Sequence, residues 1–425
     1  MTATETSPAP AASRLPVISG RQDALDGVRA IAALMVLLFH VAASTGYLLR
    51  PPTMPLRLLS RGEIGVPIFF VLSGLLLYRP WAAAVLGVRR PPGAGRYLWR
   101  RVLRLMPAYW VVMAVALGLY SRDHLSDVPS LVGLATLAYG FDPHPWWTDH
   151  LGPKGLGQMW SLSVEASYYV ALPVLAFALD RWARRGRSVD VRARRLLYAL
   201  GAMTVGSVGY AIAVLQTSDP PYWGSMLPQY LGWFGAGMAL AVVTVWANAA
   251  PLGPAARFSL TVADSAVVCW AACALVYVIA STPITGISRL NSANGWTTGF
   301  SVVLYGLVAV LLVAPAALAP AGDPVVGRVL GNPVLAFLGR VSYGIFLWQF
   351  VVIFVWFDLT GHAPFSGNLL TDFPVCFALT VAVATVSHYV VEEPVRKLGG
   401  RLASRRAAGG GRPAPSGAAG GRQGG

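Results

Sequence analysis

Apolar segments long enough to cross a lipid bilayer recur along the whole of this chain. Because a bilayer offers no water to the backbone, such segments fold as helices that satisfy their own hydrogen bonds. Of the 425 residues, 55% are hydrophobic and only 12% are charged, about half the charged fraction of a soluble domain. The sequence therefore predicts an all-α, polytopic bundle of transmembrane helices. Hydropathy and helical periodicity place about ten spans, at residues 28–48, 64–86, 104–120, 160–179, 196–216, 229–247, 262–280, 298–319, 336–357 and 373–391.

The arginines fall in alternate connections between these spans. One side takes the basic connections at 87–103 and 180–195 and the basic C-terminal tail, whereas the opposite side carries few cations. Because cytoplasmic loops hold the excess of Lys and Arg, both termini are predicted to be cytoplasmic. An even number of spans agrees with this prediction, since it places the two termini on the same side. The formal charge of +15 is thus a topology signal of a multi-pass protein of the cell membrane, and nucleic-acid binding is not expected.

The two ends of the chain differ in composition from its apolar middle. Residues 1–20 are rich in Ala, Pro, Ser and Thr and lack the apolar core of a signal peptide. Residues 399–425 are a low-complexity stretch rich in Gly and Arg. Both are predicted to be disordered tails of a transmembrane domain at 21–398. The three cysteines lie within apolar segments and lack the spacing of a metal site, so no metal is expected.

The first span carries an arginine and a histidine on one helix face. Arg29 and His40 are eleven residues apart, and eleven steps of about 100° return to nearly the same face. At about 1.5 Å per residue, His40 lies roughly 16 Å deeper, near the middle of a bilayer of about 30 Å. Ionisable groups at that depth usually mark a transport path or a reaction site. The alternative is a structural histidine satisfied by a neighbouring carbonyl.

Two further arginines stand at the start of the third span. Arg101 and Arg104 are one helical turn apart, so both guanidinium groups point the same way and can fork around phosphate groups. The alternative is plain anchoring of the span by positive charge. Arg104 lies just before Pro107 at the apolar boundary, deeper than anchoring requires, which favours the phosphate role.

A carboxylate lies inside the fourth span, in the segment QMWSLSVEASYY. Glu165 follows Trp160, which is predicted to mark the outer interface, by more than one turn. A carboxylate at that depth must be neutral, paired or functional. Glu165 and His40 enter from opposite sides and are predicted to meet, an arrangement in which the carboxylate fixes the imidazole tautomer for general-base chemistry. The alternative is a protonated Glu165 bonded to a neighbouring hydroxyl.

Two other motifs suggest structural roles. Ser73 and Gly74, in VPIFFVLSGLLLYRP, are small residues of the kind that let membrane helices pack closely. Glu392, in VEEPVRKL, lies at a helix C-terminus, where the helix dipole disfavours an anion. It is therefore predicted to pair with a cytoplasmic arginine.

Six motifs that follow one another along the chain resemble those of the membrane acyltransferase-3 family. They are DGVR with a histidine eleven residues after its arginine, FFVLSG, RxxR followed by PAY, WSLSVE, SYGIFLW and a terminal ExP. The resemblance covers about residues 20–398. It implies a ten-helix bundle that takes an acyl group, often acetyl, from cytoplasmic acyl-CoA as donor substrate. It also implies delivery to a hydroxyl of a bacterial surface glycan, lipid or secondary metabolite.

The resemblance also assigns roles to individual residues. The family's arginine and histidine pair maps onto Arg29 and His40, its RxxR pair onto Arg101 and Arg104, and its WSLxxE carboxylate onto Glu165. The arginines would hold the phosphates of acyl-CoA. His40 would take the proton of the acceptor hydroxyl or carry the acyl group covalently, with Glu165 orienting its ring. No bound cofactor is implied beyond the acyl-CoA donor.

The chain departs from the family pattern at two positions. Gln349 and Met159 stand where many members have histidine, which leaves the specificity for the acceptor open. A rival class is a transporter or lipid flippase, in which intramembrane charges line a path without chemistry. A non-catalytic membrane scaffold would leave Arg29, His40 and Glu165 unexplained.

Overall fold

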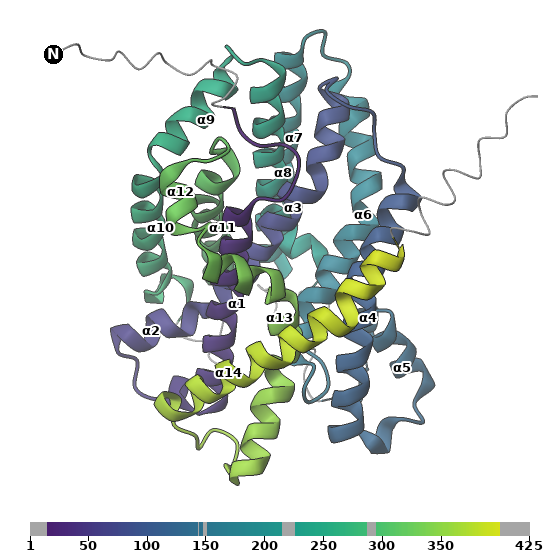
Figure 1. Cartoon of the computed structure of the whole chain (residues 1–425), viewed down its shortest axis with the longest axis vertical. Coiled ribbons are helices and arrows are strands. Elements are labelled where there is room, and N and C mark those ends of the chain that lie inside the picture. The colour runs from purple at the N-terminus through teal and green to yellow at the C-terminus, as the bar shows by residue number, and fades with distance from the viewer. Residues whose placement is uncertain (1–14, 143, 148–150, 215–225, 287–294, 400–425) are drawn as a thin grey trace, which may run out of the picture.

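The computed structural model of the chain describes residues 15–142, 144–147, 151–214, 226–286 and 295–399 (Figure 1). These residues form helices joined by turns, with one isolated bridge between Pro16 and Pro320 and no strand. The prediction of an all-α bundle is therefore confirmed. Most of the two predicted tails lies outside the described residues.

Nine helices of the described part are long and apolar enough to cross a membrane. They are α1 (Asp23–Ser44), α3 (Gly65–Val85), α4 (Ala94–Tyr120), α6 (Trp160–Ala183), α7 (Val189–Val214), α8 (Leu227–Ala249), α11 (Gly295–Leu318), α13 (Pro333–Thr360) and α14 (Leu369–Ser387). A tenth span is formed if α9 (Pro254–Asp264) and α10 (Ala266–Ala280) cross together, although the two are bent by 74°. The predicted number of about ten spans is confirmed.

Short helical segments fill the connections. Three are α-helical, namely α2 (Met54–Ser60), α5 (Val128–Ala135) and α12 (Pro324–Val329). Six are 3₁₀ turns, namely η2 (Tyr47–Leu49), η3 (Arg61–Ile64), η4 (Arg122–His124), η5 (Tyr139–Phe141), η6 (Gly157–Met159) and η8 (Pro283–Thr285). One segment, η9 (His388–Glu392), is π-helical and continues α14. The helix as a whole then runs on to Gly399.

The centre of the bundle is the close crossing of α3 and α8. A Cβ atom added at Gly237 would lie 1.9 Å from the carbonyl oxygen of Val71, and one added at Gly74 would lie 2.1 Å from that of Phe234. Both distances are far below van der Waals contact, so only glycine fits at either position. Small residues of this kind bring membrane helices into backbone contact. Gly74 thus lies at a close packing point between two helices.

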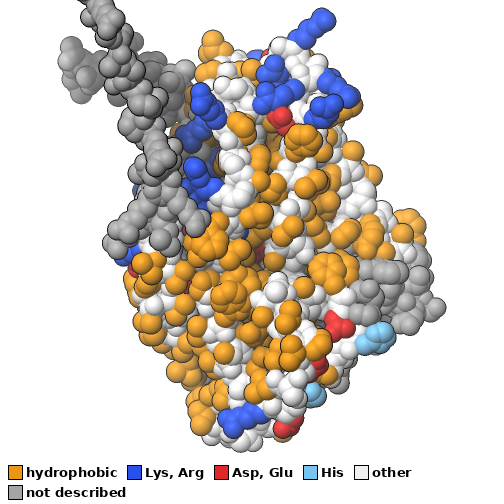
Figure 2. Space-filling view, turned by 90° about the vertical axis from the view of Figure 1, so that its right-hand side faces the viewer, with side chains coloured by type: hydrophobic (Ala, Val, Ile, Leu, Met, Phe, Trp, Pro, Cys, Tyr) orange, Lys and Arg blue, Asp and Glu red, His pale blue; other side chains and the backbone are white. Residues whose placement is uncertain are grey.

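The periphery of the bundle is apolar over its middle. Figure 2 shows hydrophobic side chains spread over this face, with Lys and Arg gathered at one end. We call this the arginine-rich end; it is where α6 joins α7, at residues 181–195. Apolar side chains of α6 and α7 such as Val174, Phe177 and Val205 are two-thirds or more exposed. A surface of this kind suits contact with lipid tails.

Two helices that are far apart in sequence run side by side in the same direction. α1 and α13 begin together, because a Cβ at Gly339 would lie 1.9 Å from the carbonyl oxygen of Asp26. Fourteen residues further along α1 and ten further along α13, His40 meets Gln349. α4 crosses the same helix, since the hydroxyl of Tyr343 donates to the carbonyl of Leu105 at 2.7 Å. These crossings position the candidate site.

The N-terminal segment before α1 is held against the bundle. Asn248 donates to the carbonyl of Pro16 at 3.0 Å, and the buried Arg79 donates to the carbonyl of Val17 at 3.2 Å. The composition of residues 15–20 predicts part of a disordered tail. In the structure they form an anchored strap that ends beside the cavity described next.

Candidate active site

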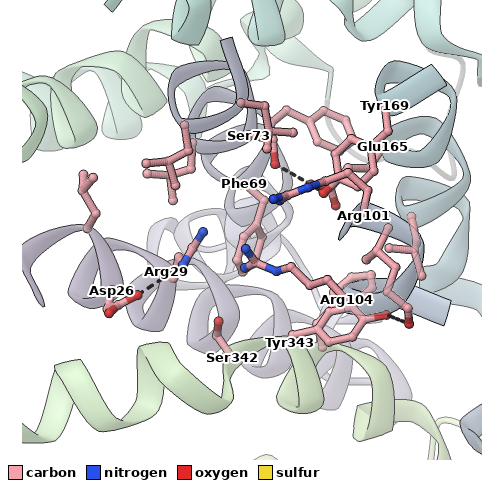
Figure 3. Close-up of a pocket in the computed structure, with 18 of the residues that line it drawn as sticks. Asp26, Arg29, Phe69, Ser73, Arg101, Arg104, Glu165, Tyr169, Ser342 and Tyr343 are labelled. Carbon is pink, nitrogen blue, oxygen red and sulfur yellow. Dashed lines mark hydrogen bonds and ion pairs between the residues drawn. The ribbon is translucent and has the colours of Figure 1, made fainter. Parts of the chain in front are cut away.

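A cavity of about 320 Å³ lies where five helices meet. Its walls come from α1, α3, α4, α6 and α13, and the strap before α1 adds residues 20–22 (Figure 3). The cavity holds four arginines against two carboxylates, so it is rich in positive charge. These charged residues are Arg21, Asp26, Arg29, Arg101, Arg104 and Glu165.

Three of the arginines converge inside the cavity. Arg29 comes from α1, and Arg101 and Arg104 come from adjacent turns of α4 (Figure 3). Arg29 forms an ion pair with Asp26, its Nη1 lying 3.2 Å from Oδ1. Among the described residues, no carboxylate oxygen lies within 4.0 Å of Arg101 or Arg104. Two guanidinium groups in this state form a natural binding site for an anion.

The arginines also repel one another. Arg104 lies close enough to both Arg29 and Arg101 for their charges to interact unfavourably. In a partly buried cavity this repulsion is screened less than at a water-exposed surface. A bound phosphate or pyrophosphate group would convert the repulsion into attraction. The electrostatics of the cavity therefore favour an anionic ligand.

Glu165 is held on the wall of this cavity by two hydroxyl groups. The Ser73 Oγ donates to its Oε1, and the hydroxyl of Tyr169 donates to the same oxygen at 2.7 Å. Ser73 therefore faces the cavity, whereas the sequence indicated only a packing role for it. Tyr169 was not singled out from the sequence, although it stands one turn after Glu165 on the same helix face.

His40 lies outside the lining of this cavity, against α13. Its Nδ1 is 3.0 Å from Oε1 of Gln349, and its ring centroid is 4.3 Å from that of Phe350. The Nε2 of Gln349 donates to the carbonyl of Phe346 at 3.0 Å, which turns its Oε1 toward the imidazole. Oε1 can only accept, so the hydrogen-bonded Nδ1 carries the proton and Nε2 of His40 is left as the basic nitrogen.

The predicted contact between His40 and Glu165 does not form. The reason lies in the segment before α6, which folds back into the bundle. The side chain of Gln158 donates to the carbonyl of Leu347 at 2.8 Å, so α6 begins beside the middle of α13 and not at an outer interface. Five residues further along α6, Glu165 is therefore level with Ser73 and the arginines. The hydrogen-bond partner of His40 is instead Gln349.

Glu392 pairs with a histidine and not with an arginine as predicted. Nδ1 of His388 lies 3.2 Å from Oε2 of Glu392, four residues further along the π-helical segment η9. In the described part of the chain no arginine approaches this carboxylate within 4.0 Å. Arg104 and Arg396 are near enough only to attract it through space. The intrahelical partner is closer because i and i+4 residues share one helix face.

Besides Tyr169, two further residues that shape the site are Asp26 and Gln158. Asp26 precedes Arg29 by one turn in DGVR, and this i, i+3 spacing is a signal that could have identified the ion pair. Gln158 acts through its bonds to backbone carbonyls of α13, which no local sequence pattern indicates. No group of three His, Cys, Asp or Glu in the described residues is arranged to hold a metal ion.

Comparison with known families agrees with this arrangement. The model of the acyltransferase-3 family, which describes an acyltransferase domain, matches residues 22–389. Its match includes every charged residue of the cavity except Arg21. The fold, the cavity and this match define an integral-membrane acyltransferase. The chain belongs to the acyltransferase-3 family.

Two similar proteins carry more specific names. The peptidoglycan O-acetyltransferase OatA of Listeria monocytogenes is 24% identical over 395 residues, which are 88% of this chain and 56% of that protein. The Bacillus subtilis protein YrhL, named provisionally as a peptidoglycan O-acetyltransferase, is 25% identical over 405 residues. That alignment covers 90% of this chain and 56% of YrhL. The chain thus spans little more than half the length of these relatives. No solved structure matches it.

Proposed function

We propose that this protein transfers an acyl group, in the first instance acetyl, from acyl-CoA to a hydroxyl group of an acceptor. The observation that carries the proposal is the convergence of Arg29, Arg101 and Arg104 on one cavity. This cavity reaches Phe346 of α13, and Gln349, one turn further along α13, bonds to His40 of α1. The names of the relatives support O-acetylation and a glycan acceptor. A lipid or a secondary metabolite with a hydroxyl group would fit the same chemistry.

The donor would enter with its phosphates at the arginines. Arg101 and Arg104 carry forked guanidinium groups that suit the two phosphates of a pyrophosphate. The same cavity is also lined by apolar side chains, among them Val66, Leu162 and Phe346. The pantetheine arm would lie along these residues, directing its thioester toward the region of His40. Glu165, held by Ser73 and Tyr169, would act as the counter-charge that positions Arg101.

His40 would carry the chemistry at the thioester. In direct transfer, Nε2 takes the proton of the acceptor hydroxyl while the oxygen forms a bond to the thioester carbon. The carbon–sulfur bond then breaks, and the imidazolium returns its proton to the sulfur as CoA thiol. In the covalent route, Nε2 attacks the thioester carbon, the carbon–sulfur bond breaks, and an acyl-imidazolium and the CoA thiolate form. The acceptor oxygen then attacks the acyl carbon, the bond from that carbon to Nε2 breaks, and the hydroxyl proton passes to the thiolate to give CoA thiol. Gln349 holds the required tautomer in both routes.

The acceptor would reach His40 from the side opposite the arginines. A row of aromatic rings from α13 and α4 leads away from the imidazole. On α13, Phe350 follows at 4.3 Å between centroids and Phe354 at a further 5.4 Å, and Tyr120 at the end of α4 follows at a further 6.1 Å. The ammonium of Lys154 lies 4.4 Å from the centroid of Tyr120 at the far end. Aromatic faces suit the apolar faces of sugar rings, which is consistent with a glycan acceptor.

Release of free CoA thiol tests the proposed reaction. Membranes containing the protein, incubated with acetyl-CoA and the acceptors present in those membranes, are expected to release thiol faster than membranes containing His40→Ala. Thiol release is the readout because a transporter or flippase would bind or move a substrate without breaking the thioester. Equal thiol release from the two preparations, at equal protein level, would count against acyl transfer by this site.

We further propose that both termini and the arginine-rich end lie in the cytoplasm, on the side of the acyl-CoA pool. Two exposed serines provide a matched test in a background without native cysteines. Ser188→Cys, between α6 and α7, is expected to resist an impermeant thiol reagent in intact cells and to react after lysis. Ser126→Cys, between α4 and α5, is expected to react in intact cells. Labelling of Ser188→Cys from outside would overturn this orientation.

A further inference from the structure

A second cavity, of about 570 Å³, adjoins the first at the arginines. The two share seven lining residues, among them Arg29, Arg104 and Tyr343. The second cavity extends between α13 and the C-terminal helix, where it is lined by Arg340, His388, Glu392 and Arg396. None of these four residues lines the first cavity. The site therefore has two chambers with Arg29 and Arg104 at their junction.

Two arginines of the second chamber, Arg340 and Arg396, have no carboxylate partner among the described residues. Glu392 is satisfied in part by His388 at 3.2 Å, and Glu393 forms an ion pair with Lys397 at 2.8 Å. In the part of the chain that the structure describes, no carboxylate lies within 4.0 Å of Arg340 or Arg396. Both are exposed at the rim of the chamber, one on α13 and one on the C-terminal helix. This pair is suited to a second phosphate group, apart from the one at Arg101 and Arg104.

One acceptor atom in this chamber lacks a donor. Oε1 of Glu392 is buried and has no hydrogen-bond partner, although Oε2 of the same carboxylate is bonded to His388. A buried carboxylate oxygen in this state is costly unless a ligand supplies an N–H or O–H group. The carboxylate is presented by the π-helical segment His388–Glu392, and insertions of this kind are frequent at functional sites.

The first cavity alone is small for coenzyme A. Its volume of about 320 Å³ is at the lower end of the roughly 300–1,000 Å³ of cavities for drug-sized ligands. Coenzyme A joins a pantetheine arm, a pyrophosphate and an adenosine that carries a 3′-phosphate. A molecule of this length needs a second chamber beyond the pyrophosphate. The second chamber adjoins the first at Arg104 and supplies the space for the adenosine half of the molecule.

We propose that the second chamber binds the 3′-phosphoadenosine half of the donor. Arg340 and Arg396 hold the 3′-phosphate, and Oε1 of Glu392 accepts a hydrogen bond from the amino group of adenine. The pyrophosphate then lies at the junction, and the acyl-pantetheine arm lies in the first cavity. This assignment rests on the proposed function, because it presupposes that acyl-CoA is the donor.

The test compares two donors that differ only in the 3′-phosphate. Binding of acetyl-CoA and of acetyl-3′-dephospho-CoA to the purified full-length protein is measured by calorimetry. The wild type is expected to bind the dephosphorylated donor about 10- to 100-fold more weakly, the effect of losing charge-assisted hydrogen bonds. The double variant Arg340→Gln/Arg396→Gln is expected to bind both donors with the weaker affinity. Arg257→Gln, an exposed arginine that lines neither chamber, serves as the control and is expected to bind like the wild type.

The remaining outcomes separate the inference from the proposed function. If the wild type binds both donors equally, the second chamber does not hold the 3′-phosphate. The same conclusion follows if the double variant loses affinity for both donors by the same factor. If the wild type binds neither donor, acyl-CoA is not the substrate and the proposed function fails first. Glu392→Ala is expected to lower the affinity for both donors by the same factor, because both carry adenine. Unchanged affinity in Glu392→Ala would overturn the adenine contact alone.

Discussion

Replacing His40 with alanine is expected to abolish acyl transfer while the protein still folds and binds the donor. A positioned general base contributes about 10²–10⁴-fold to a rate, so activity should fall by at least this factor. Donor binding should persist because the arginines that would hold the phosphates lie on the cavity wall, which His40 does not line. Turnover and acetyl-CoA affinity, measured on the same purified variant, check both parts of this expectation.

Two controls sharpen the interpretation of His40→Ala. His144→Ala removes an exposed imidazole that lines neither cavity and is expected to leave turnover unchanged. Gln349→Leu keeps the imidazole but removes the acceptor of its Nδ1 proton, so it should lower turnover with little effect on donor affinity. Substantial turnover in His40→Ala would remove His40 from the reaction and leave the catalytic group at this site to be found elsewhere.

A quenched reaction with labelled acetyl-CoA and no acceptor distinguishes the two routes. Label retained on His40 would establish the covalent intermediate, whereas its absence would favour direct transfer.

The position of Glu165 adds a further expectation. Because Glu165 lies among the arginines and not beside the imidazole, Glu165→Gln should act mainly on donor binding. A loss confined to turnover would instead indicate a coupling between Glu165 and His40 that their separate hydrogen bonds do not suggest.

The fold could be predicted from the sequence because each span is encoded locally. Hydrophobic length and the absence of charge identify a membrane helix without any knowledge of its neighbours. The level at which a helix begins is not local in this sense. α6 starts deep in the bundle because Gln158 bonds to backbone carbonyls of α13, nearly 190 residues away. Because α6 begins at this depth, Glu165 lies away from His40. The hydropathy of the sequence does not reveal the depth at which α6 begins.

The site could be predicted only where its residues share one helix. Arg101 and Arg104 face the cavity together because they are one turn apart, and the pair of Arg29 and Asp26 follows the same rule. The contact between His40 and Gln349 joins residues 309 positions apart, so it depends on the parallel packing of α1 and α13. The second chamber likewise exists only because the C-terminal helix packs near α13 and α4.

Replacing either arginine of the α4 pair with lysine is expected to weaken donor binding despite the retained charge. Arg101 and Arg104 offer forked guanidinium groups that can bind two phosphate oxygens at once, whereas lysine is a point charge on a flexible stem. Loss of one charge-assisted hydrogen bond corresponds to about 10- to 100-fold in affinity. The loss should appear as a higher dissociation constant for acetyl-CoA, with turnover at saturation changed much less.

Arg100→Lys is the matched control for this pair. Arg100 precedes Arg101 on the same helix but is exposed and lines neither cavity, so its replacement tests any general effect of lysine at the start of α4. We expect wild-type affinity in Arg100→Lys and weaker binding in both Arg101→Lys and Arg104→Lys. If all three variants bind acetyl-CoA as the wild type does, the pair is no phosphate clamp. Its positive charges would then serve only to orient α4 in the membrane, since lysine satisfies that requirement as well as arginine does.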